Sequence, residues 1–381
     1  MYFSNRSHNQ TPFATLFALG VVSAIANILI NRQLFFDHKS FAQLEDLYSR
    51  SQYVLGDAKE VILGDGDVYT YAGARYVQGA DITSINFEHP PLAKYLYGLS
   101  FSIAGMQNWV LVPMLILTPL LMWLLSTDLF TNRKFRWISI VLLLTHTAYI
   151  SNSTQTMLDF PAMFFLLISQ VVFLQLISQP SIKLGAVFGA TIALTWLTKY
   201  PFPLTIMLYG ANILWLGYKK ISIKIIVLSL ISAVVMYLFG YVSFFAQGNN
   251  LIDWLRFEWW RVQWYMGKTD NPSFYLLRTI FFGKYPAWWS ENQQMIQVAW
   301  WNIGWPIITI LFSSSLVLLH RHKSEVKIYL YWSALAFLIL STKVAEDRHL
   351  IPLLPAFALG ASFLLHEAVR ASGTRLKNKI T

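Results

Sequence analysis

The sequence predicts an all-α protein that crosses a membrane about ten times. Of its 381 residues, 55% are hydrophobic and only 13% are charged, and the mean hydropathy is +0.46. Soluble globular domains carry about 25% charged residues, so this composition indicates an integral membrane protein. Cysteine is absent, which excludes disulfides and cysteine-based metal sites.

The apolar residues are grouped into segments of nearly membrane-spanning length, which is about 20 residues for a helix. The first segment is longer than the apolar core of about 7 to 15 residues found in cleaved signal peptides, so we expect a retained helix. Ten spanning segments are predicted, at 12–31, 109–130, 137–152, 160–178, 184–198, 202–217, 223–245, 297–319, 327–342 and 350–369.

A further apolar run, 91–105, holds only 15 residues. If the N-terminus is cytoplasmic and this run does not cross, the cytoplasmic segments contain 15 of the 29 Lys and Arg residues, with Glu325 as their one acidic residue. Short basic loops on the cytoplasmic side are what the positive-inside rule predicts. A crossing at 91–105 would reverse every later loop, so we predict a half-embedded helix there. This placement accounts for the net charge of +10 without a nucleic-acid partner.

Two long external segments interrupt the single membrane domain predicted for 1–381. The first, 32–108, begins with an amphipathic stretch over 41–63 that we expect to lie along the membrane surface as a helix. It continues into "GDGDVY", where the glycines predict a turn that presents Asp65 and Asp67. Long loops in a compact membrane protein are usually functional.

The second long segment, 246–296, is rich in aromatic residues and arginine. Eight of the fifteen tryptophans lie between residues 254 and 301. An interfacial aromatic belt explains some of them. The number exceeds what one belt requires, so we expect flat rings that stack on a sugar or lipid. No soluble domain is expected after the last apolar segment.

Charged residues also occur in three short external turns. Asp159 stands before Pro161 at a helix start, where a plain N-cap is the alternative. Lys199 could simply extend to the membrane surface. The sequence "EDRH", Glu346 to His349, could form a surface ion pair. Charges at bilayer depth are costly and gather where function needs them, so together these residues predict a site.

Several motifs resemble the GT-C membrane glycosyltransferases, most closely the protein O-mannosyltransferases and the bacterial lipid A aminoarabinose transferases. The main one is "GDGDVYTYAGARYVQGADITSINFEHPPLAKYLYGLSFSIAG", which is similar to the first external loop of these families. "MLDF", "LTKY" and "DRHLIPLLP" follow in the family's order. The resemblance covers most of the chain and implies a GT-C-like fold.

The resemblance implies an inverting transfer of a sugar from a polyprenyl-phosphate donor to an acceptor outside the cytoplasm. The family's acidic motif, commonly Asp-Glu, appears here as Asp65 and Gly66. Counting back without gaps from Arg75 and Tyr76 assigns the catalytic carboxylate to Asp65, and a slip of two residues would assign it to Asp67. Its role is that of a base for the acceptor.

The donor phosphate needs positive charge and hydrogen-bond donors. A helix that begins at Pro90 or Pro91 offers both at its first turn. We therefore expect phosphate binding by His89, Lys94, Lys199, Arg348 and His349, and substrate positioning by Asp159, Glu88 and Arg75.

A divalent metal ion is a possible cofactor, since the aminoarabinose transferases bind one through a glutamate and a histidine of the two long loops. Glu88 and Asp270 are the candidates here, but "GKTDNPSFY" contains no histidine.

Two other classes of protein stay open. Many helices and intramembrane charges also suit a transporter or lipid flippase, although no inverted repeat is evident. The altered acidic motif would also suit an inactive relative. The expected partners are a polyprenyl-phosphate-linked sugar donor, a protein, lipid or glycan acceptor, and membrane lipids. The expected location is the plasma (inner) membrane of a prokaryote with an extracytoplasmic active site, or the endoplasmic reticulum membrane of a eukaryote.

Overall fold

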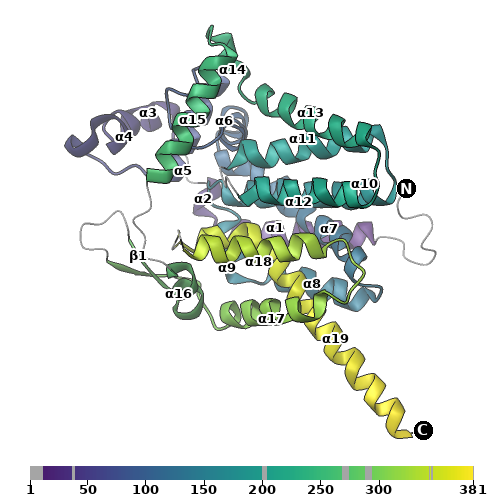
Figure 1. The fold of residues 1–381 in the computed structure, drawn as a ribbon. Helices are drawn as coiled ribbons and strands as arrows, with labels where there is room; N and C mark the ends of the chain where they lie inside the picture. Colours follow the sequence, from purple (N-terminus) through teal and green to yellow (C-terminus); the bar gives the residue numbers. More distant parts are fainter. Residues whose placement is uncertain are drawn as a thin grey trace.

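The computed structural model describes residues 12–36, 39–199, 204–267, 274–287, 294–342, 344 and 346–380. Within these residues the chain is mostly helical, and its two short strands, β1 (Lys284–Pro286) and β2 (Met295–Gln297), pair antiparallel. Most of the apolar helices run side by side, and the short elements of the two long segments predicted to be external gather at one end of them (Figure 1).

The first third of the chain supplies two neighbouring long helices and the insertion between them. The long helices α1 and α7 pack against each other. The elements are α1 (Phe13–Ile30), α2 (Gln33–Phe36), α3 (Phe41–Ser49), α4 (Gln52–Leu55), the 3-10 helix η1 (Gly56–Ala58), α5 (Asp65–Val77), α6 (Leu92–Ala104), η2 (Gln107–Val110) and α7 (Leu111–Leu129).

The remaining helices complete the bundle. They are α8 (Arg133–Leu144), α9 (Thr147–Asn152), α10 (Asp159–Ser178), α11 (Ile182–Thr198), α12 (Leu204–Tyr218), α13 (Ile223–Phe239), α14 (Val242–Ala246), α15 (Leu251–Gly267), α16 (Tyr275–Phe282), α17 (Gly304–Leu319), α18 (Lys327–Ser341), η3 (Asp347–Leu353) and α19 (Leu354–Ile380).

Four helical stretches among the described residues are long and apolar enough to cross a membrane: Phe13–Ile30, Gln107–Leu129, Asp159–Ser178 and Asp347–Ser372. Five shorter apolar helices, α11, α12, α13, α17 and α18, coincide with predicted spans. The predicted span 137–152 is divided between α8 and α9. The helical class is therefore confirmed, and the number of ten crossings stays a prediction.

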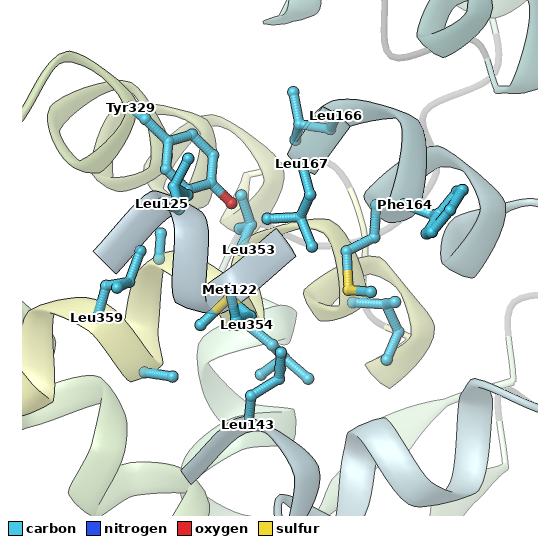
Figure 2. Packing of buried hydrophobic residues seen from close by; sticks show 14 of the residues in the cluster. Met122, Leu125, Leu143, Phe164, Leu166, Leu167, Tyr329, Leu353, Leu354 and Leu359 are labelled. Carbon is cyan, nitrogen blue, oxygen red and sulfur yellow. The ribbon is translucent and has the colours of Figure 1, made fainter. Parts of the chain in front are cut away.

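The core surrounds α10, whose apolar window is 78% buried. Phe164, Leu166 and Leu167 of α10 lie among leucines of η3 and α19 and residues of α7 (Figure 2). By contrast, valines on α13 remain exposed, for example Val234 at 58%. An apolar helix that is exposed on one face suits contact with lipid.

The amphipathic stretch 41–63 forms shorter helices than predicted. Ser40 and Gln43 form a reciprocal capping box that starts α3, and α3 ends at Ser49. A second short helix, α4, begins after Ser51, whose hydroxyl accepts a hydrogen bond from the amide of Tyr53 at 3.3 Å. The break turns the chain back toward α5.

The predicted turn at "GDGDVY" was wrong, because these residues begin a helix. Gly64 is the N-cap of α5, and Asp65 and Asp67 lie in its first turn. Carboxylates are favoured at this position because they interact with the positive end of the helix dipole. A Cβ at Gly66 would lie 3.2 Å from Thr156 Cβ, so glycine permits close contact with the segment before α10.

Two glycines allow α5 and α6 to approach each other backbone to backbone. A Cβ on Gly73 would overlap the carbonyl of Lys94, and one on Gly98 would overlap the backbone of Gly73. As predicted, α6 begins at the double proline, with Pro91 as its N-cap, and it ends at Gly105 with φ of 71°. This helix pair sets the position of the loop between its members.

Candidate functional site

The candidate site lies where the start of α5 meets η3. Asp65, the first residue of α5, accepts a hydrogen bond on Oδ2 from Arg348 Nη1 at 2.7 Å. The Tyr53 hydroxyl lies 3.4 Å from the other carboxylate oxygen. The side chains of Arg348 and Asp65 are 19% and 32% exposed, so the pair is reachable from solvent.

Arg348 is shared between two carboxylates. Its Nε lies 2.6 Å from Glu346 Oε2 in an ion pair, while Nη1 faces Asp65. The Met157 sulfur lies 3.1 Å from Nη1, and Asp159 is within electrostatic range. A planar guanidinium can bridge two acids in this way because its donors form a rigid fork.

Asp159 and Lys199 form a second ion pair beside Arg348. Asp159 is the first residue of α10 and Lys199 directly follows α11. Their side chains are 4% and 14% exposed, and Lys199 Nζ donates to Asp159 Oδ1. The Asp159 side chain makes no capping hydrogen bond, since the N-cap of α10 is Leu158. Lys199 therefore has a buried partner instead of extending to the membrane surface.

The loop between α5 and α6 brings Glu88 and His89 to the same cluster. Burial lowers the pKa of His89 well below its usual range, and the neighbouring charges of Lys199, Lys94 and Arg348 lower it further. The His89 ring also contacts Tyr69 edge to face, with centroids 6.0 Å apart. His89 is therefore a neutral imidazole at pH 7.

Glu88 and His349 are placed by electrostatic neighbours. Burial raises the pKa of the Tyr53 hydroxyl, and the charges of Asp65 and Glu88 raise it further, so Glu88 lies within electrostatic range of Tyr53. His349 lies in η3 within electrostatic range of Lys199 and Arg348.

Lys94 is held inside the loop and not at its surface. Its side chain is fully buried, and Nζ donates to the backbone carbonyls of Asn86 and His89. It also lies 5.7 Å from the centre of the Tyr76 ring. Lys94 therefore fixes the conformation of the segment that carries Glu88 and His89.

Two predicted residues lie elsewhere, and a third is not described. Asp67 forms an exposed ion pair with Lys39, at 2.7 Å. Arg75, near the end of α5, lies 3.7 Å from Glu45 at the surface. Asp270 falls outside the described residues. Of the two carboxylates considered for catalysis, Asp65 alone contacts the cluster around Arg348 in the described part of the chain.

The described residues contain no group of three or more His, Asp or Glu side chains that could hold a metal ion. Glu88, the metal candidate that is described, lies within electrostatic range of Tyr53 and Lys94. The described carboxylate and imidazole side chains therefore do not form a metal site by themselves.

Arg261 is a residue near the site that sequence reasoning missed. It lies on α15, is only 1% exposed, and donates to Glu258 at 2.6 Å and to the Tyr241 hydroxyl at 2.9 Å. Its charge reaches His89 and Lys94. The two external segments also touch through Phe87 and Trp260, whose ring centroids are 4.8 Å apart. The only sequence signal was that the segment 246–296 is rich in arginine and aromatic residues. That signal does not distinguish Arg261 from the other arginines of the segment.

Residues 106–260 match a family model described as dolichyl-phosphate-mannose-protein mannosyltransferase. Among solved structures, ArnT from Cupriavidus metallidurans bound to undecaprenyl phosphate matches with a TM-score of 0.60 and 15% identity over 97% of this chain and 63% of that chain. The chain has the GT-C fold of ArnT. The apo structure of ArnT matches with a TM-score of 0.55 and 14% identity over 95% of this chain and 62% of that chain.

These matches confirm the resemblance predicted from the motifs and the integral membrane character of the chain. No curated protein sequence matches it. The chain spans about 63% of the length of ArnT. In this GT-C fold the family-model match begins after α6, so the segment that carries Asp65 and His89 lies outside it.

Proposed function

We propose that this chain is an inverting glycosyltransferase that moves a sugar from a polyprenyl-phosphate donor to an acceptor on the non-cytoplasmic side of the membrane. The observation that carries the proposal is the Asp65–Arg348 pair beside the Asp159–Lys199 pair. It supplies a carboxylate and two cations at the end of the helices where both long external segments meet. The GT-C fold shared with ArnT bound to undecaprenyl phosphate supports a polyprenyl-phosphate donor.

Asp65 acts as the base. The acceptor hydroxyl or amine attacks the anomeric carbon of the sugar, and its proton passes to the Asp65 carboxylate. The new bond joins the acceptor atom to the anomeric carbon, and the bond from that carbon to the phosphate oxygen breaks. Attack opposite the leaving phosphate inverts the anomeric centre, by the same logic as in inverting glycosidases.

The leaving phosphate binds to Arg348 and Lys199, with His89 and His349 as neutral hydrogen-bond donors. Positive charge at this position stabilises the charge that develops on the phosphate. Both cations are paired with carboxylates in this structure. A donor phosphate therefore competes with Asp65 for Arg348, and its binding would release the Asp65 carboxylate for the acceptor.

The other predicted residues take supporting roles. Asp159 positions Lys199, and Lys94 holds the loop of Glu88 and His89 in place. Glu88, whose charge acts on Tyr53 and on Lys94, is proposed to position the sugar. The membrane is proposed to be the plasma membrane of a prokaryote, or the endoplasmic reticulum membrane of a eukaryote, and the acceptor a protein, lipid or glycan.

The test uses the purified protein in proteoliposomes with a labelled polyprenyl-phosphate sugar. We expect Asp65→Asn to lower the transfer rate by about 100-fold to 10,000-fold, which is the usual contribution of a positioned base. Asp67→Asn is the matched control, since Asp67 is two residues away and is paired with Lys39 at the surface. Runs with and without EDTA test for a divalent ion.

The outcomes separate the proposal from its alternatives. Movement of label across the bilayer without transfer would indicate a flippase, and neither movement nor transfer would indicate an inactive relative. Transfer that survives Asp65→Asn but is lost in Asp67→Asn would move the base to Asp67.

A further inference from the structure

A connector at residues 152–157, which leads from the last residue of α9 toward α10, contacts the first two residues of η3. Asn152, at the start of the connector, donates a hydrogen bond from Nδ2 to Asp347 Oδ2 at 3.0 Å. At the end of the connector, the Met157 sulfur lies 3.1 Å from Arg348 Nη1. Asp347 and Arg348 are consecutive in η3, so one short stretch of chain contacts both residues.

Buried hydrogen bonds hold the connector itself in place. Asn152 is only 5% exposed. The Tyr97 hydroxyl donates to the backbone carbonyl of Met157 at 2.6 Å, and the Thr156 hydroxyl donates to Asn108 Oδ1 at 2.6 Å. Tyr97, Thr156 and Asn108 are buried as well. Buried polar groups whose hydrogen bonds are satisfied make the structure around them rigid, so the connector gives η3 a fixed support.

The Asp347 carboxylate contacts the connector, whereas the adjacent Glu346 pairs with Arg348. In the part of the chain that the structure describes, Asp347 forms no ion pair, and Asn152 is the only side chain that donates a hydrogen bond to it. A hydrogen bond from an amide to a carboxylate is charge-assisted, so it is stronger than one between neutral groups. Because it joins residues 195 positions apart, this contact fixes η3 relative to α9.

We infer that Asp347 is a positioning residue, which holds η3 through its hydrogen bond with Asn152 so that the Arg348 guanidinium faces Asp65 and the donor phosphate. The inference rests on the proposed function, in which Arg348 binds that phosphate. Asp347 acts through Arg348 and is assigned no contact with the donor itself.

Donor binding increases the importance of this support. When a phosphate displaces Asp65 from Arg348, the guanidinium loses one of its two carboxylate partners. The hydrogen bond between Asp347 and Asn152 does not involve Arg348, so it persists and keeps the η3 backbone in place. A misplacement of about 1 Å in a binding group can lower the rate of a reaction by about 100-fold. Loss of the Asp347 contact should therefore be measurable as weaker donor binding.

The first measurement is the affinity of the purified full-length protein for undecaprenyl phosphate, determined by native mass spectrometry in detergent. This probe carries the phosphate without a sugar, so the measurement does not require transfer. We expect Asp347→Ala to weaken binding by about tenfold, the loss expected for one charge-assisted hydrogen bond. In the transfer assay, the donor KM should rise by a similar factor, and kcat should change less.

Asp347→Asn separates the hydrogen bond from the charge. Its side-chain oxygen can still accept a hydrogen bond from Asn152, but the negative charge next to Arg348 is removed. We expect an affinity within about threefold of that of the unmodified protein, or a tighter one. If Asp347 acted only through its charge, Asp347→Asn and Asp347→Ala would change the affinity by the same factor. A structural role alone would lower the melting temperature of Asp347→Ala and leave its affinity unchanged.

A double-variant cycle tests the contact with Asn152. Asn152→Ala and the double variant Asn152→Ala/Asp347→Ala should each weaken binding by about tenfold, and not by the roughly hundredfold expected of independent residues. Asp46→Ala is the matched control, since this carboxylate of α3 is paired with Arg50 at the surface and is 59% exposed. It should bind undecaprenyl phosphate as the unmodified protein does.

Three results would overturn the inference alone. They are an unchanged affinity in Asp347→Ala while Arg348→Gln binds more weakly, an equal change in Asp347→Asn and Asp347→Ala, and an additive loss in the double variant. If the unmodified protein does not bind undecaprenyl phosphate, the proposed function is overturned together with this inference. If Asp347→Ala fails to give a cooperative melt, the affinity of Asn152→Ala decides by the first of these criteria.

Discussion

Asp65 and Arg348 are 283 residues apart in the sequence, and their side chains meet with Asp65 Oδ2 2.7 Å from Arg348 Nη1. One belongs to the first turn of α5 and the other to η3, just before α19. Because Arg348 also contacts Glu346 at 2.6 Å, its charge is fully matched by carboxylates in this state. A donor phosphate that reaches Arg348 must therefore displace a carboxylate, which links donor binding to the freedom of Asp65.

We predict that Arg348→Lys raises the donor KM and lowers kcat, with kcat/KM reduced by about 100-fold or more. A lysine keeps the charge, but its ammonium has one nitrogen and cannot contact Asp65 and Glu346 through two separate nitrogens as the guanidinium does. Steady-state kinetics with a polyprenyl-phosphate sugar measure the effect. Arg75→Lys, at the surface beside Glu45, is the control and should leave kinetics unchanged. If Arg348→Lys had the same kcat and KM as the unmodified protein, the role assigned to the planar guanidinium would be contradicted.

The Asp159–Lys199 pair should contribute to stability as a unit. Asp159→Asn leaves the Lys199 charge without its buried partner, and we expect a loss of about 3 kcal/mol in the free energy of unfolding. Lys199→Met should cost a similar amount, and the double variant Asp159→Asn/Lys199→Met should recover at least half of the summed loss. Denaturant unfolding in mixed micelles measures all three. Strictly additive losses would show that the two side chains do not interact.

The gathering of distant residues into one cluster could be predicted from the sequence. Asp159, Lys199 and Arg348 each lie at the end of an apolar segment, and counting basic loops placed those ends on one membrane face. Alternate ends of antiparallel helices share a face, so the residues were expected to lie close together. Counting the basic residues in each loop required no knowledge of which residues contact each other.

The pairing within the cluster could not be predicted. At about 100° per residue, two positions along a helix change direction by about 200°, so the start of α5 at Asp65 points Asp65 and Asp67 to opposite sides. The sequence "GDGD" favoured a turn, in which both carboxylates would be presented together. The sequence also could not predict whether Lys94 reaches a donor phosphate, because its burial depends on how closely α5 approaches α6.

That close approach gives a prediction about Gly73. A Cβ there would overlap the backbone of Lys94, so Gly73→Ala must separate the two helices. We expect a loss of about 1 to 3 kcal/mol in stability, together with lower transfer activity because the loop of His89 moves. Gly210→Ala in α12 is the matched control. No atom lies within 4 Å of its added Cβ, and the change should be neutral or slightly stabilising. A stable, active Gly73→Ala would contradict the packing of α5 on α6.

His89 gives a prediction about pH. Burial, with the charges of Lys199, Lys94 and Arg348, lowers the pKa of His89 in the folded protein, whereas the unfolded chain binds a proton near pH 6.5. Below that pH the unfolded state binds more protons, so stability falls as the pH falls through 6.5 toward the folded pKa. The contribution of this one group reaches about 1 kcal/mol at pH 5.5.

Replacing His89 by Gln removes the titrating group but keeps the backbone carbonyl that accepts the Lys94 hydrogen bond. We therefore expect the His89→Gln variant to lose about 1 kcal/mol less than the unmodified protein between pH 7.5 and 5.5. Denaturant unfolding at a series of pH values measures the difference. His320→Gln, at an exposed histidine after α17, should follow the unmodified protein. Parallel pH profiles for His89→Gln and the unmodified protein would mean that His89 is charged without penalty, and it would then bind phosphate as a cation instead of as a neutral donor.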